Sequence, residues 1–129
     1  MPVLTLPSLR TRDAGRSRPL RVVAFCAAWC DTCNQFRAVF ERIAATHRDA
    51  CFVWLDIEDD SEICGDVDVE NFPTLAIFRM ETPLHFGVSL PHEASVVRLV
   101  DEMAERATSV GDAPASIVEL GRRLQDYLG

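Results

Sequence analysis

Two short apolar runs separated by an amphipathic stretch constrain the fold of this chain most. The first run covers residues 20–26 (Leu-Arg-Val-Val-Ala-Phe-Cys) and the second covers residues 51–57 (Cys-Phe-Val-Trp-Leu-Asp-Ile). Both are typical of strands that are buried on both faces. From Asp31 onward, apolar side chains recur at the spacing of one helix face: Phe36, Val39, Phe40 and Ile43. The order strand–helix–strand therefore predicts an α/β domain.

Further segments complete the predicted architecture. We expect an edge strand at residues 3–6, a short helix capped by Ser61, strands at residues 74–78 and 84–88 joined by a turn containing Pro83, and a helix with Val96, Leu99, Val100 and Met103 on one face. Elements in this order indicate a central mixed sheet of about four to five strands flanked by helices.

A second amphipathic helix follows at the C-terminus. Pro114 suits its first turn, and an apolar stripe follows: Ile117, Leu120, Leu124 and Tyr127 or Leu128. The stripe needs a partner, which is the domain itself, a second copy of the chain or another protein; we expect the domain itself. We therefore predict an N-terminal strand and irregular segment (1–19), a core domain (20–107) and a C-terminal helical extension packed on the same domain (108–129).

Charge and apolar content argue against two classes of partner. The net charge is -7, from 20 acidic and 13 basic residues, whereas a general nucleic-acid binder needs a basic surface. A polar segment punctuated by Gly and Pro favours a solvated loop for the basic residues near the N-terminus: Arg10, Arg12, Arg16, Arg18 and Arg21. No apolar stretch has the length of a membrane span and no targeting signal is visible, so we expect a cytoplasmic protein.

A cysteine pair marks the junction between the first apolar run and the helix. Cys30 and Cys33 are three positions apart, at the start of the predicted helix. The unpaired N–H groups and positive dipole end of a helix N-terminus favour a thiolate at Cys30. Cys33, one turn deeper, can resolve a mixed disulfide. A structural zinc site needs about four ligands, and His47, His85 and His92 form no metal-binding doublet, so we expect no metal.

Two segments that surround this pair resemble the thioredoxin family. Residues 22–30 (Val-Val-Ala-Phe-Cys-Ala-Ala-Trp-Cys) are similar to the strand that leads into the Trp-Cys-x-x-Cys site of that family, and residues 72–75 (Phe-Pro-Thr-Leu) resemble its cis-proline loop. Gly87 resembles the glycine of the last sheet strand. The resemblance covers about residues 20–107. It implies a thioredoxin-like fold in which Cys30 is the nucleophile and Cys33 the resolving thiol.

The resemblance also implies how substrate and electrons reach the site. The Phe72-Pro73 bond is expected to be cis and to face the cysteines, leaving room for an extended peptide. The implied substrate-binding residues are Trp29, Asp31, Thr32, Phe72, Pro73 and Thr74. No cofactor is expected beyond a redox-active Cys30–Cys33 disulfide. The implied partners are disulfide-containing proteins or small thiol compounds and an electron-donor reductase, for a monomer or weak homodimer acting in cell redox homeostasis.

Several positions depart from the family pattern. Ala24 and Trp54 occupy the positions where many thioredoxins carry a buried carboxylate and a lysine, so water would have to move the proton of the resolving thiol. Asp31 and Thr32 replace the usual Gly-Pro. Cys26 and Cys51 are interpreted as small buried hydrophobic residues. Cys64, on a short and more exposed helix, is the better candidate for a regulatory thiol, although a packing role is favoured there too.

The sequence leaves two classes of function open. We favour a thiol–disulfide oxidoreductase that reduces protein or small-molecule disulfides. The alternative is a non-catalytic binding or assembly module that acts through its acidic surface or its C-terminal helix. Turnover of a disulfide substrate such as insulin separates the two classes. A thiol oxidase would differ from the reductase only in its reduction potential.

Overall fold

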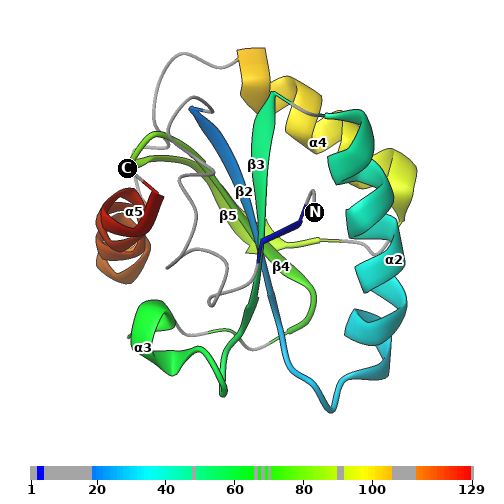
Figure 1. The fold of residues 1–129 in the computed structure, drawn as a ribbon, viewed down its shortest axis with the longest axis horizontal. Coiled ribbons are helices and arrows are strands. Elements are labelled where there is room, and N and C mark those ends of the chain that lie inside the picture. The colour runs from blue at the N-terminus through cyan, green and yellow to red at the C-terminus, as the bar shows by residue number, and fades with distance from the viewer. Residues whose placement is uncertain are drawn as a thin grey trace.

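Five strands form one mixed sheet in the order β1-β3-β2-β4-β5 (Figure 1). This computed structural model describes residues 3–4, 19–47, 49–65, 67, 69, 71–89, 92–105 and 113–128. The strands are β1 (Val3–Leu4), β2 (Leu20–Cys26), β3 (Ala50–Asp56), β4 (Thr74–Arg79) and β5 (Thr82–Val88). β1 and β2 pair with β3 in parallel, whereas β4 pairs antiparallel with β2 and β5. The predicted α/β fold with a mixed sheet is confirmed.

Helices cover both faces of the sheet. Figure 1 shows α2 (Asp31–Thr46) and α4 (Glu93–Glu105) on one side, and α3 (Ser61–Cys64) and α5 (Ala115–Leu128) on the other. Side-chain alternation in β2 supplies both layers, because successive residues of a strand point to opposite faces. Val22 and Ala24 join the core under α2 and α4, whereas Val23 and Phe25 join the core under α3 and α5.

The C-terminal helix α5 packs on the sheet. Ile117, Leu120 and Leu124 are fully buried in the core that they share with β2, β3 and β4. Arg123 adds polar contacts, donating from Nε to the Ile63 carbonyl (2.7 Å) and from Nη2 to the Cys64 carbonyl (3.1 Å). These bonds satisfy carbonyls at the end of α3, which a helix leaves unpaired. The three-segment division of the chain at 19 and 107 stays a prediction.

Arg21 corrects the expectation of a solvated basic segment. Its side chain is fully buried within β2, where Nη1 donates to the Met80 carbonyl (3.1 Å) and to Gln125 Oε1 (2.7 Å). Desolvation lowers the pKa of Arg21, against a smaller opposing attraction to Cys51 and Glu81. Strand alternation explains the burial, because position 21 points to the same face as Val23. The other four arginines of that group lie outside the described residues.

Local differences from the predicted elements concern turns and helix starts. Pro83 lies inside β5, and the chain reverses at Met80, which has a positive φ of 55°. Ser61 is the first helical residue of α3 and not its cap, because the N-cap position belongs to Asp60. The predicted strand at 3–6 is described only as Val3–Leu4. None of the helices in the described part of the chain is both long enough and apolar enough to cross a bilayer.

Candidate active site

Cys30 lies where the loop after β2 enters α2. It is the N-cap residue of that helix, with extended backbone angles (φ -89°, ψ 115°) and a half-buried side chain. Its N–H donates to the Ala27 carbonyl (3.0 Å), and its carbonyl accepts from the N–H of Asn34 (3.1 Å). Asp31 follows as an exposed acidic residue in the first turn. The Cys30 sulfur therefore sits at the positive end of α2 with access to solvent.

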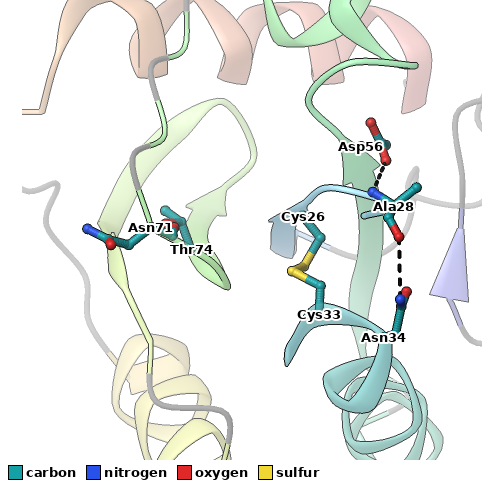
Figure 2. The surroundings of a disulfide bond; sticks show 7 residues. All are labelled: Cys26, Ala28, Cys33, Asn34, Asp56, Asn71 and Thr74. Atoms are coloured by element: carbon teal, nitrogen blue, oxygen red, sulfur yellow. Dashed lines mark hydrogen bonds between the residues drawn. A yellow bond between two sulfur atoms is a disulfide. The ribbon is translucent and has the colours of Figure 1, made fainter. Parts of the chain in front are cut away.

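Cys33 is bonded to Cys26 and not to Cys30 in this structure (Figure 2). The Cα atoms of the disulfide partners are 5.8 Å apart, and both side chains are buried. Cys26 is thus buried, as interpreted from the sequence, but it is also a disulfide partner, which that interpretation did not include. The sequence signal was strand alternation, which turns Cys26 to the same face as Ala24, toward the helix that carries Cys33. The expected Cys30–Cys33 disulfide stays a prediction.

One carboxylate that the sequence reasoning missed holds the loop before Cys30. Asp56, at the end of β3, accepts through Oδ2 a hydrogen bond from the Ala28 N–H (2.8 Å; Figure 2). Its Oδ1 accepts from the N–H groups of Glu58 (2.8 Å) and Asp59 (2.9 Å). On the other side of the loop, the Ala28 carbonyl accepts from Asn34 Nδ2 (3.3 Å). The sequence signal was an acidic residue closing an apolar strand beside the cysteine pair.

An exposed aromatic surface adjoins Cys30. Trp29 is 68% exposed, and its ring meets that of Phe72 edge to face, with centroids 5.6 Å apart. The Trp29 indole Nε1 donates to the Glu58 carboxylate. Thus two of the predicted substrate-binding residues, Trp29 and Phe72, are in contact although they are distant in sequence. Asp31 and Thr32 are exposed beside them in the first turn of α2.

The loop before β4 carries the remaining predicted contacts. The Phe72-Pro73 bond is cis, and the Pro73 carbonyl accepts from the Ser89 N–H (3.0 Å). Thr74 is 3% exposed, and its hydroxyl donates to the Asn71 carbonyl (2.6 Å). The Thr74 side chain therefore organises this loop and presents no hydroxyl to the surface.

Two of the departures from the family pattern, at positions 24 and 54, lie side by side. Ala24 and Trp54 are register partners in the parallel pair of β2 and β3. The Trp54 ring packs near Phe36 (6.3 Å) and Phe40 (5.8 Å), and the Arg37 guanidinium lies 4.8 Å above it. A methyl group and an indole thus occupy these positions, and neither transfers a proton. Resolution by Cys33 has no help from a carboxylate at position 24.

The other candidate thiols and ligands lie away from this site. Cys64 is 2% exposed, and burial, with a smaller effect of Asp60, raises its pKa to about 12. A packing role for Cys64 is therefore favoured over a role as a regulatory thiol. His47 binds Asp101 through Nε2 (3.0 Å). Within the described residues, no group of three or more His, Cys, Asp or Glu side chains could hold a metal.

Comparisons with known proteins agree with this geometry. The family model Thioredoxin matches residues 12–102. The chain is 33% identical over 60 residues to Thioredoxin-2 of Saccharomyces cerevisiae, covering 46% of this chain and 58% of that protein. It is 31% identical over 70 residues to Thioredoxin domain-containing protein 2 of Mus musculus, covering 54% of this chain and 13% of that protein. The matches thus span less than two thirds of either relative.

Solved structures show the same fold. A mutant thioredoxin from Halobacterium salinarum superposes with a TM-score of 0.66 at 22% identity, covering 82% of this chain and 94% of that chain. Fasciola hepatica thioredoxin superposes with a TM-score of 0.64 at 21% identity, covering 80% and 99%. At these identities the likeness establishes the architecture, and the chemistry has to be argued from the residues themselves.

Proposed function

Because this chain belongs to the thioredoxin family, as the match over residues 12–102 establishes, we propose that it is a thiol–disulfide oxidoreductase that reduces protein or small-molecule disulfides. The observation that carries the proposal is the position of Cys30. It is a half-buried thiol at the N-cap of a 16-residue helix, with Cys33 fully buried one turn further on. Helix N-termini stabilise thiolates, and the thiolate is the attacking species.

The reaction proceeds in two exchanges from the reduced dithiol. The Cys30 thiolate attacks one sulfur of the substrate disulfide, forming a mixed disulfide and releasing the first substrate thiolate. The Cys33 thiol then loses its proton to water, because Ala24 supplies no base, and its thiolate attacks Cys30 Sγ. This attack releases the second substrate thiolate and forms the Cys30–Cys33 disulfide. The substrate gains two electrons, and the two cysteines lose two.

The surroundings of Cys30 favour an extended peptide as substrate. Trp29 and Phe72 form the apolar surface described above. We expect the backbone beside the cis Phe72-Pro73 bond to pair with a substrate strand. Exposed carboxylates at Asp31 and Glu58 border this surface and favour basic or neutral partners. An electron-donor reductase would restore the dithiol through the same surface. We propose the cytoplasm as compartment, where such thiols stay reduced.

Insulin reduction tests the proposed activity. With dithiothreitol as electron donor, we expect the wild type to accelerate precipitation of the insulin chains at least tenfold over dithiothreitol alone. Cys30→Ser should remove this acceleration, because the attacking sulfur is gone. Cys33→Ser should accumulate a mixed disulfide with the substrate, visible by mass. Cys51→Ala, a buried cysteine of the neighbouring strand, serves as the matched control and should retain the wild-type rate.

Equal rates for the wild type and Cys30→Ser, no faster than dithiothreitol alone, would contradict the oxidoreductase and leave a non-catalytic binding module. Equilibration of the protein with reduced and oxidised glutathione decides the direction of electron flow. A reductase stays oxidised at ratios where glutathione is mostly reduced, whereas an oxidase becomes reduced.

A further inference from the structure

Three cysteines converge at the junction of β2 and α2, although a two-thiol exchange needs only a pair. Cys26 closes β2 on the face toward α2, Cys33 lies on the inner side of the first turn of α2, and Cys30 caps the same helix. Cys33 is three residues from Cys30, and its Cα atom is 5.8 Å from that of Cys26, with the two sulfurs bonded. The sulfur of Cys33 therefore has two alternative disulfide partners, Cys26 and Cys30.

We propose that Cys26 is a third exchanging thiol. It replaces Cys30 as the disulfide partner of Cys33 and so moves the disulfide from the surface into the core. The inference rests on the proposed function for the origin of the Cys30–Cys33 disulfide. Starting from that disulfide, the Cys26 sulfur attacks Cys33 Sγ and the Cys30 thiolate leaves. The proton lost by Cys26 is taken up by Cys30. One S–S bond forms as another breaks, so no external oxidant or reductant is needed.

Burial favours the inner disulfide as the oxidised form. Cys26 is 1% exposed and Cys33 is fully buried, so a disulfide between them is uncharged and leaves neither sulfur able to ionise in the core. Cys30, in contrast, is partly exposed at a helix N-terminus, where a thiolate is better tolerated. The exchange therefore places the leaving thiolate at the only one of the three positions that reaches solvent.

The consequence is an oxidised protein whose nucleophile is free. With Cys33 held by Cys26, a second substrate disulfide that reacts at Cys30 meets no resolving thiol. The mixed disulfide then persists until the released substrate thiol or another external thiol attacks it and frees Cys30. The buried pair is also shielded from direct attack, so reductants must act through Cys30. A protein with only Cys30 and Cys33 lacks both properties.

Peptide mapping distinguishes the two oxidised forms. The reduced protein is oxidised with one equivalent of diamide, quenched in acid at successive times and labelled with N-ethylmaleimide under denaturing conditions. Cleavage before Asp31 separates residues 13–30, which carry Cys26 and Cys30, from residues 31–48, which carry Cys33. In the linked pair of peptides, the label on Cys30 reports the inner disulfide, and the label on Cys26 reports the outer one. We expect the Cys30 label to dominate at late times.

A native labelling assay gives a second, independent readout. A large maleimide should add once to the oxidised wild type, at Cys30, and raise its apparent mass on a gel by one adduct, because Cys51 and Cys64 are buried. Oxidised Cys26→Ala should show none, since Cys30 is then tied to Cys33. Cys51→Ala is the matched control and should behave as the wild type. Cys30→Ser should still form an internal disulfide with diamide, by losing two hydrogens from Cys26 and Cys33.

An outer disulfide alone at all times, or loss of native labelling in the oxidised wild type, would overturn the inference. Insulin turnover measured in parallel decides the proposed function separately. Absence of turnover together with the inner disulfide overturns the oxidoreductase and supports the exchange. Full turnover together with only the outer disulfide supports the oxidoreductase and overturns the role of Cys26.

Discussion

The carboxylate of Asp56 accepts a hydrogen bond from the backbone N–H of Ala28 at 2.8 Å, two residues before Cys30. The other oxygen of the same carboxylate accepts from the N–H groups of Glu58 and Asp59. One side chain at the end of β3 therefore fixes the loop that presents the nucleophile and the loop that leads to α3. Charged acceptors make the stronger hydrogen bonds of proteins.

Removal of this carboxylate should loosen the active-site loop. We expect Asp56→Ala to lower the free energy of unfolding by about 1–3 kcal/mol, because three N–H groups lose their acceptor. Asp56→Asn keeps one carbonyl oxygen and should cost less. Urea unfolding followed by tryptophan fluorescence measures both. Asp59→Ala removes the same charge from an exposed position and should change stability by less than about 0.5 kcal/mol; an equal loss in both alanine variants would contradict the role of Asp56.

The elements around this loop were predictable from apolar periodicity, but their contacts were not. The helical stripe of Phe36 and Phe40 and the apolar β2 run predicted α2 and its neighbouring strand, because each depends on local spacing. Which carboxylate reaches Ala28 depends on the register of β2 against β3, which aligns Cys26 with Asp56. Register follows from tertiary packing, so the Asp56 contact lay beyond what local spacing can predict.

Cys64 should make stability fall at alkaline pH. Its folded-state pKa of about 12 lies above the ordinary value of 9.0 because the thiol is buried. A thiol with a raised pKa binds its proton more tightly when folded, so its contribution is complete below pH 9 and is lost as pH rises toward 12. Between pH 9 and pH 11 we expect a loss of about 2–3 kcal/mol through this group. Urea titrations across this range, at constant redox state, measure it.

The composition limits the groups that interfere with this measurement. All 13 residues counted as Lys or Arg are arginines and the chain has one tyrosine, so no lysine and a single tyrosine contribute between pH 9 and pH 11. Cys64→Ala should remove the slope attributed to Cys64, whatever the variant costs in stability at neutral pH. Cys51→Ala is the control for loss of a buried thiol and should keep the Cys64 contribution. An unchanged slope in Cys64→Ala would refute the assignment.

Gly121 allows α5 to approach the turn between β4 and β5. A Cβ atom at this position would collide with the backbone carbonyl oxygen of Glu81 and lie 3.1 Å from the Phe78 ring. Alanine favours helices by about 1 kcal/mol over glycine, but a backbone oxygen cannot rotate away. We therefore expect Gly121→Ala to destabilise the protein by about 1–3 kcal/mol in thermal or urea unfolding.

The matched control for this substitution is Gly87→Ala. Its Cβ atom would meet only the His85 ring, at 3.7 Å, which is ordinary van der Waals contact. We expect a change in stability of less than about 0.5 kcal/mol. Equal stability of Gly121→Ala and the wild type would show that α5 can shift away from the turn, and the close packing of that helix would be contradicted.

Arg21 shows why charge alone misleads sequence interpretation. Its place among other arginines suggested solvent, while its place in an apolar run suggested burial, and the two signals conflicted. Strand alternation decides the outcome, because odd positions of β2 face α5. The partner that makes burial tolerable is Gln125, 104 residues away. Such a contact depends on where the C-terminal helix docks, which the chain's local patterns do not specify.

The pair of Arg21 and Gln125 gives the last prediction, a double-mutant cycle. The guanidinium is fully buried, and its Nε and Nη2 have no hydrogen-bond partner among the described residues. Gln125→Leu should therefore cost about 1–3 kcal/mol, because it removes one of the two acceptors of Nη1 and leaves the charge buried. Arg21→Met removes the charge itself, and its free energy of unfolding should stay within about 1 kcal/mol of the wild-type value. Urea unfolding of the double variant should then show a coupling energy of at least about 1 kcal/mol. If the losses of stability in the two single variants simply add in the double variant, or if Gln125→Leu leaves stability unchanged, the 2.7 Å bond does not hold α5 to β2.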